Sequence, residues 1–481
     1  MLFNSFEFML FLPIVFLLYW FVFKPRRLQN LFLVVASYIF YGWWDWRFLL
    51  LIALTSACSY ASGLLLEHYE GKRQAQKIVS ASNIVLNLLI LGIFKYYNFF
   101  VESFESLFAS LFNYHLDWVT INVILPVGIS FYTFQALSYT IDVYQKKLPA
   151  THDIVEFFAY ISFFPQLVAG PIERATNLLP QFQRDRQFDY AKAVDGCRQM
   201  LWGFLKKLVV ADNCASMINE DWGRYAELPG EMLLLLGILF TFQIYCDFSG
   251  YSDIAIGCSR LLGFNLMRNF NFPYFSRSIP EFWRMWHISL MTWFRDYIYF
   301  PLGGSRCTRW KVIRNTMIVF FVSGLWHGAN WTFICWGLYH ACLIAIFILL
   351  GINTKHKDIV ASGKYFPTIK ETLQMTTTFF LVIIGWIIFR AESMTQALGY
   401  LSALFRNEFF IPSMHHGGLY LSFGLIVIFI EWLQRNKQHA LQFPNTGLFN
   451  NRIIRWIIYY SIVISISQYV GQDQTFIYFQ F

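Results

Sequence analysis

Long apolar runs alternate with short polar stretches along most of the chain. A helix that crosses a bilayer needs about 20 predominantly apolar residues. The segments that we predict to be membrane-spanning helices cover residues 8–23, 28–44, 47–66, 78–100, 121–142, 231–262, 312–326, 331–351, 373–390, 417–433 and 453–470. Apolar stretches broken by charges, Pro or Gly, which we expect to be re-entrant or interfacial, cover 154–170, 197–217 and 284–301. The pattern predicts an all-α polytopic membrane protein with roughly 11–12 transmembrane helices.

The polar stretches between these runs are short. The longest cover residues 101–120, 171–196, 352–372 and 434–452, and none has room for a soluble domain. No internal repeat is evident, which disfavours the transporter folds that are built from repeats. We therefore expect residues 1–481 to form a single membrane-embedded domain.

The composition leads to the same class of protein. Charged residues make up 14% and hydrophobic residues 57% of the 481 residues, whereas soluble domains carry about 25% charged residues. A chain this apolar cannot cover its surface with polar groups in water, which excludes a soluble enzyme. The formal net charge of +8 then reflects Lys and Arg in cytoplasmic loops, and we expect no nucleic-acid partner.

Basic clusters indicate how the chain is oriented. They follow the first, third and fifth predicted spans and consist of Lys24, Arg26 and Arg27, then Lys72, Arg73 and Lys77, then Lys146 and Lys147. Loops after odd-numbered spans lie on one side of the membrane, and cytoplasmic loops carry the excess of Lys and Arg. The clusters therefore predict an N-terminus outside the cytoplasm. The first span has no basic n-region and no small-residue cleavage site, so we expect an uncleaved helix.

Polar residues at membrane depth are costly and are functional candidates for that reason. His327 lies between two predicted spans, and an imidazole, with a reference pKa of about 6.5, can take or give a proton near neutral pH. If this segment is helical, Asn330 and Trp331 share the face of His327. The alternative is a structural histidine beside a close helix contact at Gly324 and Gly328.

A second histidine, His287, lies 40 residues before His327. If residues 282–294 are helical, His287 is a lone imidazole on an apolar face with Trp283 and Leu290. A lone histidine in such a place is more often structural than catalytic. The presence of two such histidines nevertheless favours a shared cavity.

Two carboxylates, Asp247 and Asp253, lie inside the apolar run 231–262 and need hydrogen-bond donors. Candidate donors are Arg260, Arg268, Arg284 and backbone amides at a helix break at Gly250. Buried ionic groups are more often paired than catalytic, so we favour a structural network over acid–base catalysis.

Basic side chains that lie among Trp, Phe and Gly form the last group of candidates. They are Lys206, Lys207, Arg277, Arg284, Arg306 and Arg309. Such side chains hold the phosphates of a ligand at the cytoplasmic mouth or, as an equal alternative, anionic lipid head groups. The sequence has no Walker motif, and its eight cysteines show no zinc spacing, so we expect no metal site.

Several motifs occur in order along nearly the whole chain. They cover residues 1–5, 11–13, 127–135, 164–172, 247–253, 271–275, 282–287, 324–328 and 476–481. Together they resemble the membrane-bound O-acyltransferase family, and in particular its bacterial branch of alginate O-acetyltransferases. The resemblance implies a multi-helix membrane fold with a tunnel or funnel.

The resemblance also implies roles for individual residues. The near-invariant histidine of the family corresponds to His327, which implies a general base or an orienting group for the acceptor hydroxyl. The second polar position corresponds to His287, which implies orientation of the acceptor or stabilisation of the tetrahedral oxyanion. Further candidates for the substrate pocket are Trp286, Trp326, Asn330 and Asp247.

An acetyl transfer across the membrane is the activity that the resemblance implies. The donor is cytoplasmic acetyl-CoA, a co-substrate and not a tightly bound cofactor, and the acceptor is an exported polysaccharide. The resemblance implies the bacterial cytoplasmic (inner) membrane, surrounding lipid, and an SGNH-type partner outside the cytoplasm, because the chain has no domain to hold the polymer. Alternatives that stay open are a D-alanyl transferase of the teichoic-acid type, a transporter, and a scaffold of a glycan secretion complex.

Overall fold

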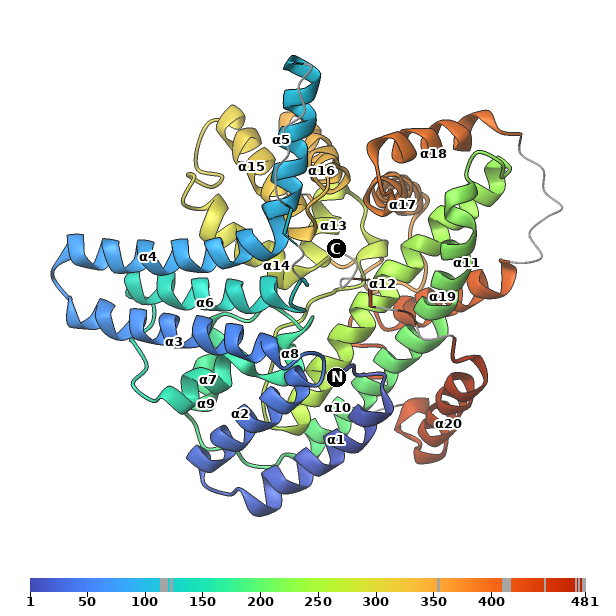
Figure 1. The fold of residues 1–481 in the computed structure, drawn as a ribbon. Coiled ribbons are helices and arrows are strands. Elements are labelled where there is room, and N and C mark those ends of the chain that lie inside the picture. The colour runs from blue at the N-terminus through green and yellow to red at the C-terminus, as the bar shows by residue number, and fades with distance from the viewer. Residues whose placement is uncertain are drawn as a thin grey trace. The chain divides into compact units, whose positions relative to one another are not determined.

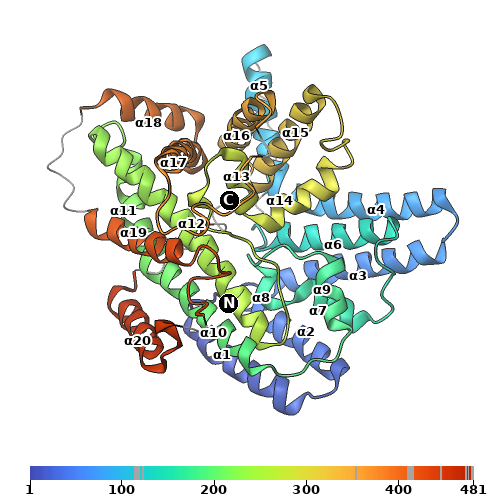
Figure 2. The same cartoon turned by 180° about the vertical axis from the view of Figure 1, so that it is seen from behind.

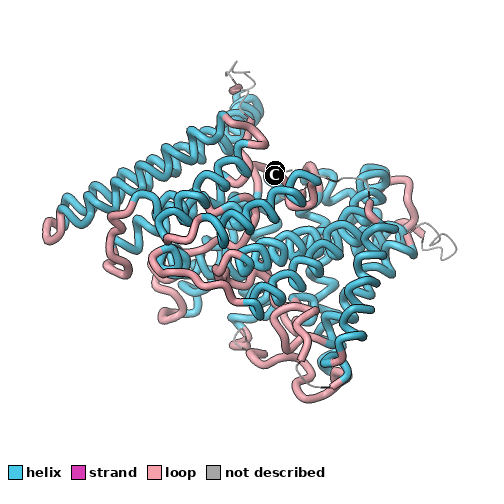
Figure 3. Tube along the Cα trace, turned by 90° about the horizontal axis from the view of Figure 1, so that it is seen from below, coloured by secondary structure: helices cyan, strands magenta, loops and turns pink. Residues whose placement is uncertain are grey.

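The computed structural model describes residues 1–112, 120–121, 124–352, 355–408, 417–444, 447–471, 474 and 476–477. All regular structure in these residues is helical, as the colours of Figure 3 show, which confirms the predicted all-α fold. The chain forms two compact units, Met1–Ala193 with Ser259–Leu266 and Val194–Cys258 with Met267–Phe481. Of the terminal motif at 476–481, residues 478–481 lie outside the described residues.

The first unit is built from helices α1 to α9. They are α1 (Phe6–Leu17), α2 (Arg26–Gly42), α3 (Arg47–His68), α4 (Arg73–Leu91), α5 (Tyr97–Phe112), α6 (Ile129–Tyr144), α7 (Ile154–Ser162), α8 (Phe164–Leu167) and α9 (Ala175–Phe182), with π-helical turns η1 (Leu18–Val22) and η2 (Gly92–Tyr96). Helices α3, α4 and α6 lie side by side (Figures 1 and 2). Between them, the Asn83 amide donates to Thr140 at 2.7 Å and to Ser59 at 3.3 Å, so this buried polar group is satisfied.

Three boundaries in the first unit differ from the prediction, one of them being the start of α4 at Arg73, five residues before the predicted residue 78. The span predicted at 121–142 begins only at Ile129, because Gly128 before it takes a left-handed backbone conformation with φ 76°. The first part of the polar stretch predicted at 101–120 is helical, since α5 continues to Phe112 with no Gly or Pro to end it.

The second unit holds most of α10, all of α11, most of α12 and the helices that follow α12 along the chain. Its elements are α10 (Tyr190–Phe204), η3 (Leu205–Ala211), α11 (Asp212–Asp221), η4 (Trp222–Arg224), α12 (Gly230–Leu261), η5 (Pro273–Phe275), α13 (Ile279–Met285), α14 (Ile288–Phe294), η6 (Arg295–Tyr299), α15 (Arg309–His327), α16 (Trp331–Leu349), α17 (Ile369–Arg390), α18 (Met394–Arg406), α19 (Gly418–Leu433), η8 (Leu448–Asn450) and α20 (Arg452–Tyr469). Helices α12, α15, α16, α17, α19 and α20 begin and end within four residues of the predicted spans. Helix α18 was not predicted, because its apolar run is too short for a span.

Helices α15 and α16 form a tightly packed hairpin. A side chain at Gly324 would place its Cβ 2.4 Å from the carbonyl oxygen of Phe333, and one at Gly337 would place its Cβ 2.2 Å from that of Phe320. The two backbones therefore approach as closely as glycine permits. This contact fixes the end of α15, and with it His327, against α16.

Five helical segments of the described chain are long and apolar enough to cross a membrane. They are Arg47–His68, Arg73–Phe112, Gly230–Leu261, Trp331–Leu349 and Ile369–Arg390. Two shorter apolar helical segments, Phe6–Val22 and Gly418–Leu433, accompany them. The protein is thus a multi-pass, all-helical membrane protein.

Candidate active site

His327 is the last residue of α15 and is almost completely buried, at 4% exposure. The helix ends there because Gly328 is extended and Asn330 begins the next helix as its N-cap. The imidazole lies edge-on to Trp336, with ring centroids 4.9 Å apart, and to Phe389, at 5.4 Å. Aromatic rings therefore surround this imidazole and exclude water from it.

The expected helical face shared by His327, Asn330 and Trp331 is not formed, because the chain leaves the helix at Gly328. The Asn330 side chain instead accepts a hydrogen bond from the backbone of Thr332 at 3.0 Å and donates to the carbonyl of Glu392 at 2.9 Å. Both ends of this amide are thus engaged in holding the α16 N-terminus.

His287 lies in the turn between α13 and α14 and not on a helix face, which corrects the expectation for residues 282–294. Its backbone is left-handed, with φ 45°, and its side chain is 1% exposed. The ring packs edge-on to Phe248 at 4.6 Å, and its Nδ1 lies 3.0 Å from Oδ1 of Asn269. His287 is outside the five spanning helices, and burial lowers its pKa to about 3, so the imidazole is neutral at physiological pH.

The Trp326 indole brings the two histidines together. Its ring centroid lies 5.0 Å from that of His327 and 5.7 Å from that of His287, and both contacts are edge-on. The ring of Trp286 packs against that of Trp386, with centroids 4.8 Å apart. Two imidazoles that contact the same indole ring are close enough to act on one substrate. Trp286, in contrast, contributes to packing.

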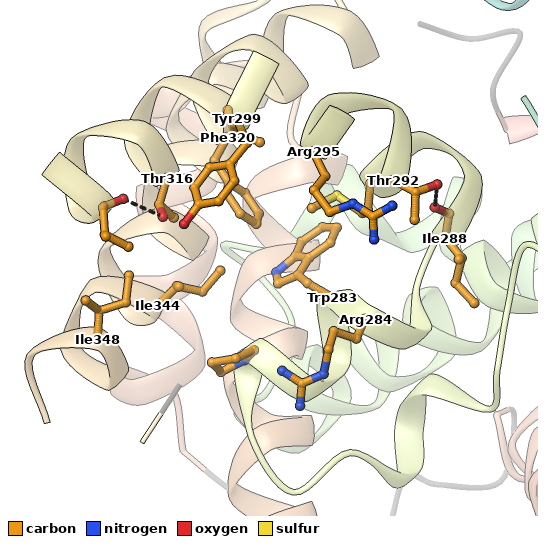
Figure 4. Close-up of a pocket in the computed structure, with 14 residues that line it drawn as sticks. Trp283, Arg284, Ile288, Thr292, Arg295, Tyr299, Thr316, Phe320, Ile344 and Ile348 are labelled. Carbon is orange, nitrogen blue, oxygen red and sulfur yellow. Dashed lines mark hydrogen bonds between the residues drawn. The ribbon is translucent and has the colours of Figure 1, made fainter. Parts of the chain in front are cut away.

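A cavity of about 440 Å³ opens among α13, α14, η6, α15 and α16 (Figure 4). Its wall is mostly apolar, and Arg284 and Arg295 line it together with Trp283, which lies between them in the figure. Arg295 is paired with Asp296 at 2.8 Å. The cavity thus offers an apolar interior with guanidinium groups beside it, which suits an amphiphilic ligand that carries phosphate.

One face of α16 leads from this cavity toward His327. Ile348 and Ile344 line the cavity, and His340 and Trp336 follow at the same spacing of four residues. The cavity residue Trp283 contacts Trp336, with ring centroids 5.5 Å apart, and Trp336 contacts His327. Two indole rings therefore separate the cavity from the histidine.

The buried carboxylates of α12 are paired with lysines that the sequence places among the candidate ligands of a phosphate or an anionic lipid head group. Lys207 contacts both Asp247 and Asp212 at 2.8 Å, and Lys206 contacts Asp253 at 2.6 Å. Helix α12 is unbroken at Gly250, so no backbone amides are freed there, and lysines contact the carboxylates for which the sequence suggested arginines. The two lysines and Asp247 form a structural network, with the charge of each lysine compensated inside the protein.

Arg277 is also committed to protein carboxylates. Its guanidinium contacts Glu281 at 2.8 Å and Asp358 at 3.2 Å, and its side chain is 4% exposed. The hydrogen bond from Arg277 lowers the pKa of the Asp358 carboxyl. Arg277 thereby fastens the loop after α16, and Arg284 holds the same loop through the carbonyl oxygens of Lys355 and His356, at 3.1 and 2.9 Å.

We predict that Arg277→Ala destabilises the protein by about 3–5 kcal/mol, because Glu281 is left buried without its cation. Thermal unfolding in detergent, followed by intrinsic fluorescence, measures the loss. The matched control is Arg306→Ala, an exposed arginine, whose removal should change stability by less than about 0.5 kcal/mol. Weaker binding of a phosphate-bearing ligand at unchanged stability in Arg277→Ala would contradict the structural role.

The remaining expected phosphate ligands, Arg306 and Arg309, are exposed near the start of α15. Sequence reasoning did not single out Asn269, Trp336 or Arg295, and it placed Trp283 only on the expected face of His287. Asn269 lies only two residues before the motif at 271–275, which was a usable signal. In the described part of the chain, no group of three His, Cys, Asp or Glu side chains is placed to hold a metal ion.

Comparisons with known proteins identify the family of the chain. Residues 38–371 match the membrane-bound O-acyltransferase family. The chain is 41% identical over 406 residues to the probable alginate O-acetylase AlgI of Pseudomonas aeruginosa, covering 84% of this chain and 75% of that protein. It is 32% identical over 423 residues to the peptidoglycan O-acetyltransferase of Helicobacter pylori, covering 82% and 77%.

A relative that is named for a different activity is matched over less of this chain. The teichoic acid D-alanyltransferase of Bacillus subtilis is 30% identical over 283 residues, which cover 56% of this chain and 70% of that protein. The family match and the long alignments together establish the class of the protein. The chain is an acyltransferase and belongs to the membrane-bound O-acyltransferase family.

Proposed function

We propose that this protein takes an acetyl group from acetyl-CoA at the cytoplasmic face and passes it across the membrane for O-acetylation of an exported polysaccharide. Relatives named as an alginate O-acetylase and a peptidoglycan O-acetyltransferase cover more than four fifths of the chain and support this acceptor class. The observation that carries the proposal is the pair of buried histidines, His327 and His287, on one indole. Both compact units act together as one domain, in the bacterial cytoplasmic membrane, with the N-terminus outside.

The donor enters at the cavity. Arg284 lines it, and Arg306 and Arg309 are exposed near the start of α15, the helix that also contributes Val312 and Thr316 to the cavity wall. We do not include Lys206, Lys207 and Arg277 among the phosphate ligands, because carboxylates already compensate their charges. The expected ligands of the CoA phosphates are therefore Arg284, Arg306 and Arg309.

His327 acts as the general base. It removes the proton of the acceptor hydroxyl, the oxygen forms a C–O bond with the thioester carbonyl, and the C–S bond breaks. The proton then passes to the CoA thiolate, so that thiol and ester are the products. The aromatic walls keep water from the thioester and prevent its hydrolysis.

Binding of the acceptor polysaccharide requires a second protein. The polar stretches between the helices are too short to fold into a polysaccharide-binding domain. An SGNH-type partner outside the cytoplasm supplies that surface, receives the acetyl group and modifies the polymer. The enzyme assignment removes the transporter and scaffold alternatives, and the D-alanyl transferase remains as the second candidate.

Inside-out membrane vesicles from cells that express the protein test the donor and its side. With [14C]acetyl-CoA added outside, we expect label in base-labile esters of the glycan fraction, because the cytoplasmic face is exposed. Right-side-out vesicles should give none, since acetyl-CoA does not cross the bilayer. Label that appears only from a D-[14C]alanyl carrier thioester would replace this proposal with the second candidate.

A further inference from the structure

Asn269 lies at the centre of a small buried hydrogen-bond network. It is 0% exposed, and its Nδ2 donates to the Ser252 hydroxyl of α12 at 3.1 Å. Its Oδ1 accepts from the Ser289 hydroxyl at 2.9 Å and from the Ser289 backbone N–H at 3.4 Å. It also lies 3.0 Å from Nδ1 of His287.

Asn269 also holds the backbone next to His287. The N–H of Ile288 donates to the backbone carbonyl oxygen of Asn269 at 2.8 Å. His287 itself is left-handed, with φ 45°, a conformation that is uncommon for a residue other than glycine and persists only where neighbours impose it. Asn269 therefore fixes both the backbone and the ring of His287.

This network determines which nitrogen of His287 carries the proton. A backbone N–H can only donate, so the Asn269 atom that accepts from Ser289 is the amide oxygen. An oxygen that only accepts requires a donor on the His287 side, which places the imidazole proton on Nδ1. In the neutral ring, Nε2 is then a hydrogen-bond acceptor.

We propose that Asn269 is a positioning residue that holds His287 in the Nδ1-protonated tautomer, so that Nε2 accepts a hydrogen bond from an O–H or N–H of the substrate. This inference rests on the proposed function, since it assumes that His287 contacts the substrate. It changes the role expected for His287: a neutral imidazole with its proton on Nδ1 cannot donate to the tetrahedral oxyanion. His287 therefore orients the substrate, and oxyanion stabilisation belongs to another group.

Solid-state NMR of the full chain in lipid measures the tautomer directly. With 15N-histidine labelling, the chain gives signals from ten histidines, and the His287→Gln spectrum identifies those of His287. We expect a protonated Nδ1 and an unprotonated Nε2 in the wild-type protein. A protonated Nε2 overturns the proposal without any measurement of activity.

Substitutions of Asn269 separate positioning from packing. Asn269→Leu keeps the size of the side chain but removes the acceptor, so we expect loss of the Nδ1-protonated state and a kcat lower by about 10- to 100-fold, at an unchanged KM for acetyl-CoA. Asn269→Asp keeps an acceptor oxygen at the same place and should retain the tautomer and more activity than the Leu variant. Asn271→Leu, two residues along the same loop, is the matched control and should resemble the wild type.

The outcomes distinguish this inference from the proposed function. Asn269 is not a positioning residue if Asn269→Leu leaves the tautomer of His287 unchanged. The same conclusion follows if Asn269→Asp loses the Nδ1-protonated state and has a kcat as low as that of Asn269→Leu. If His287→Ala transfers acetyl groups as fast as the wild type while the tautomer is as expected, the role of His287 in the proposed function fails instead. Should the Leu variant not fold, the wild-type and Asp spectra still decide the question.

Discussion

The His327→Ala variant is expected to lose acetyl transfer, by about 10²- to 10⁴-fold, while its level in the membrane stays near that of the wild type. A positioned general base contributes a factor of this size. The buried imidazole of His327 contacts Trp336, the residue at the inner end of the α16 face that starts in the cavity. The measurement is the base-labile O-acetyl content of the exported glycans in a chromosomal mutant. A deletion strain sets the zero, and immunoblotting of membranes sets the amount of protein.

A matched control comes from another histidine of the same chain. His152 is exposed and pairs with Glu67 at 2.9 Å on the first unit, so His152→Ala should leave acetylation unchanged. His327→Gln keeps a polar side chain of similar length but provides no base, and we expect it to be as inactive as the Ala variant. Wild-type acetylation in either His327 variant at normal expression would remove His327 from the chemistry.

Much of the helical organisation could be predicted from the sequence, because apolar runs bounded by polar residues set helix ends locally. Helix α12 at Gly230–Leu261 and helix α20 at Arg452–Tyr469 each lie within one residue of their predicted positions. The start of α6 was missed because the left-handed Gly128 interrupts an apolar run without changing its composition. The composition of a segment indicates whether it lies in lipid or in water. The position of a turn depends instead on the backbone torsion of a single residue.

The site was predictable only in part. His327 and His287 were found from motifs, and the structure places them on one indole, but their local backbone was predicted wrongly. The turn at His287 depends on Asn269, which is 18 residues away in sequence, so no local pattern reveals it. The pairing of Arg277 with Glu281, four residues later, had a visible signal in the spacing.

The pairing of Lys207 is the plainest example of what a sequence conceals. Its partner Asp247 is 40 residues away, and a π-helical segment, Leu205–Ala211, carries the lysine. Neither the ion pair nor the wider helical turn has a periodic signature. A lysine in an apolar stretch therefore looked like a phosphate ligand until its buried partners were known.

Lys207→Met is accordingly expected to destabilise the protein by about 3–5 kcal/mol or more, since it removes the cation that contacts both of the buried carboxylates, Asp247 and Asp212. Asp247 also accepts the backbone N–H of Ile477 at 2.7 Å, so the loss should loosen the C-terminal segment. Thermal unfolding in detergent and the folded fraction by size exclusion measure the effect. In the folded fraction, we expect an unchanged KM for acetyl-CoA.

Two comparisons make this prediction specific to a buried ion pair. Neutralising both sides, in Lys207→Met with Asp212→Asn and Asp247→Asn, should recover part of the lost stability, because the cost lies in the uncompensated charges and not in the missing contacts. Arg309→Ala, at an exposed arginine proposed to bind phosphate, should show the opposite pattern, a higher KM at unchanged stability. If Lys207→Met instead raised the KM and unfolded at the wild-type temperature, Lys207 would be a phosphate ligand, and the carboxylates of α12 would need another cation.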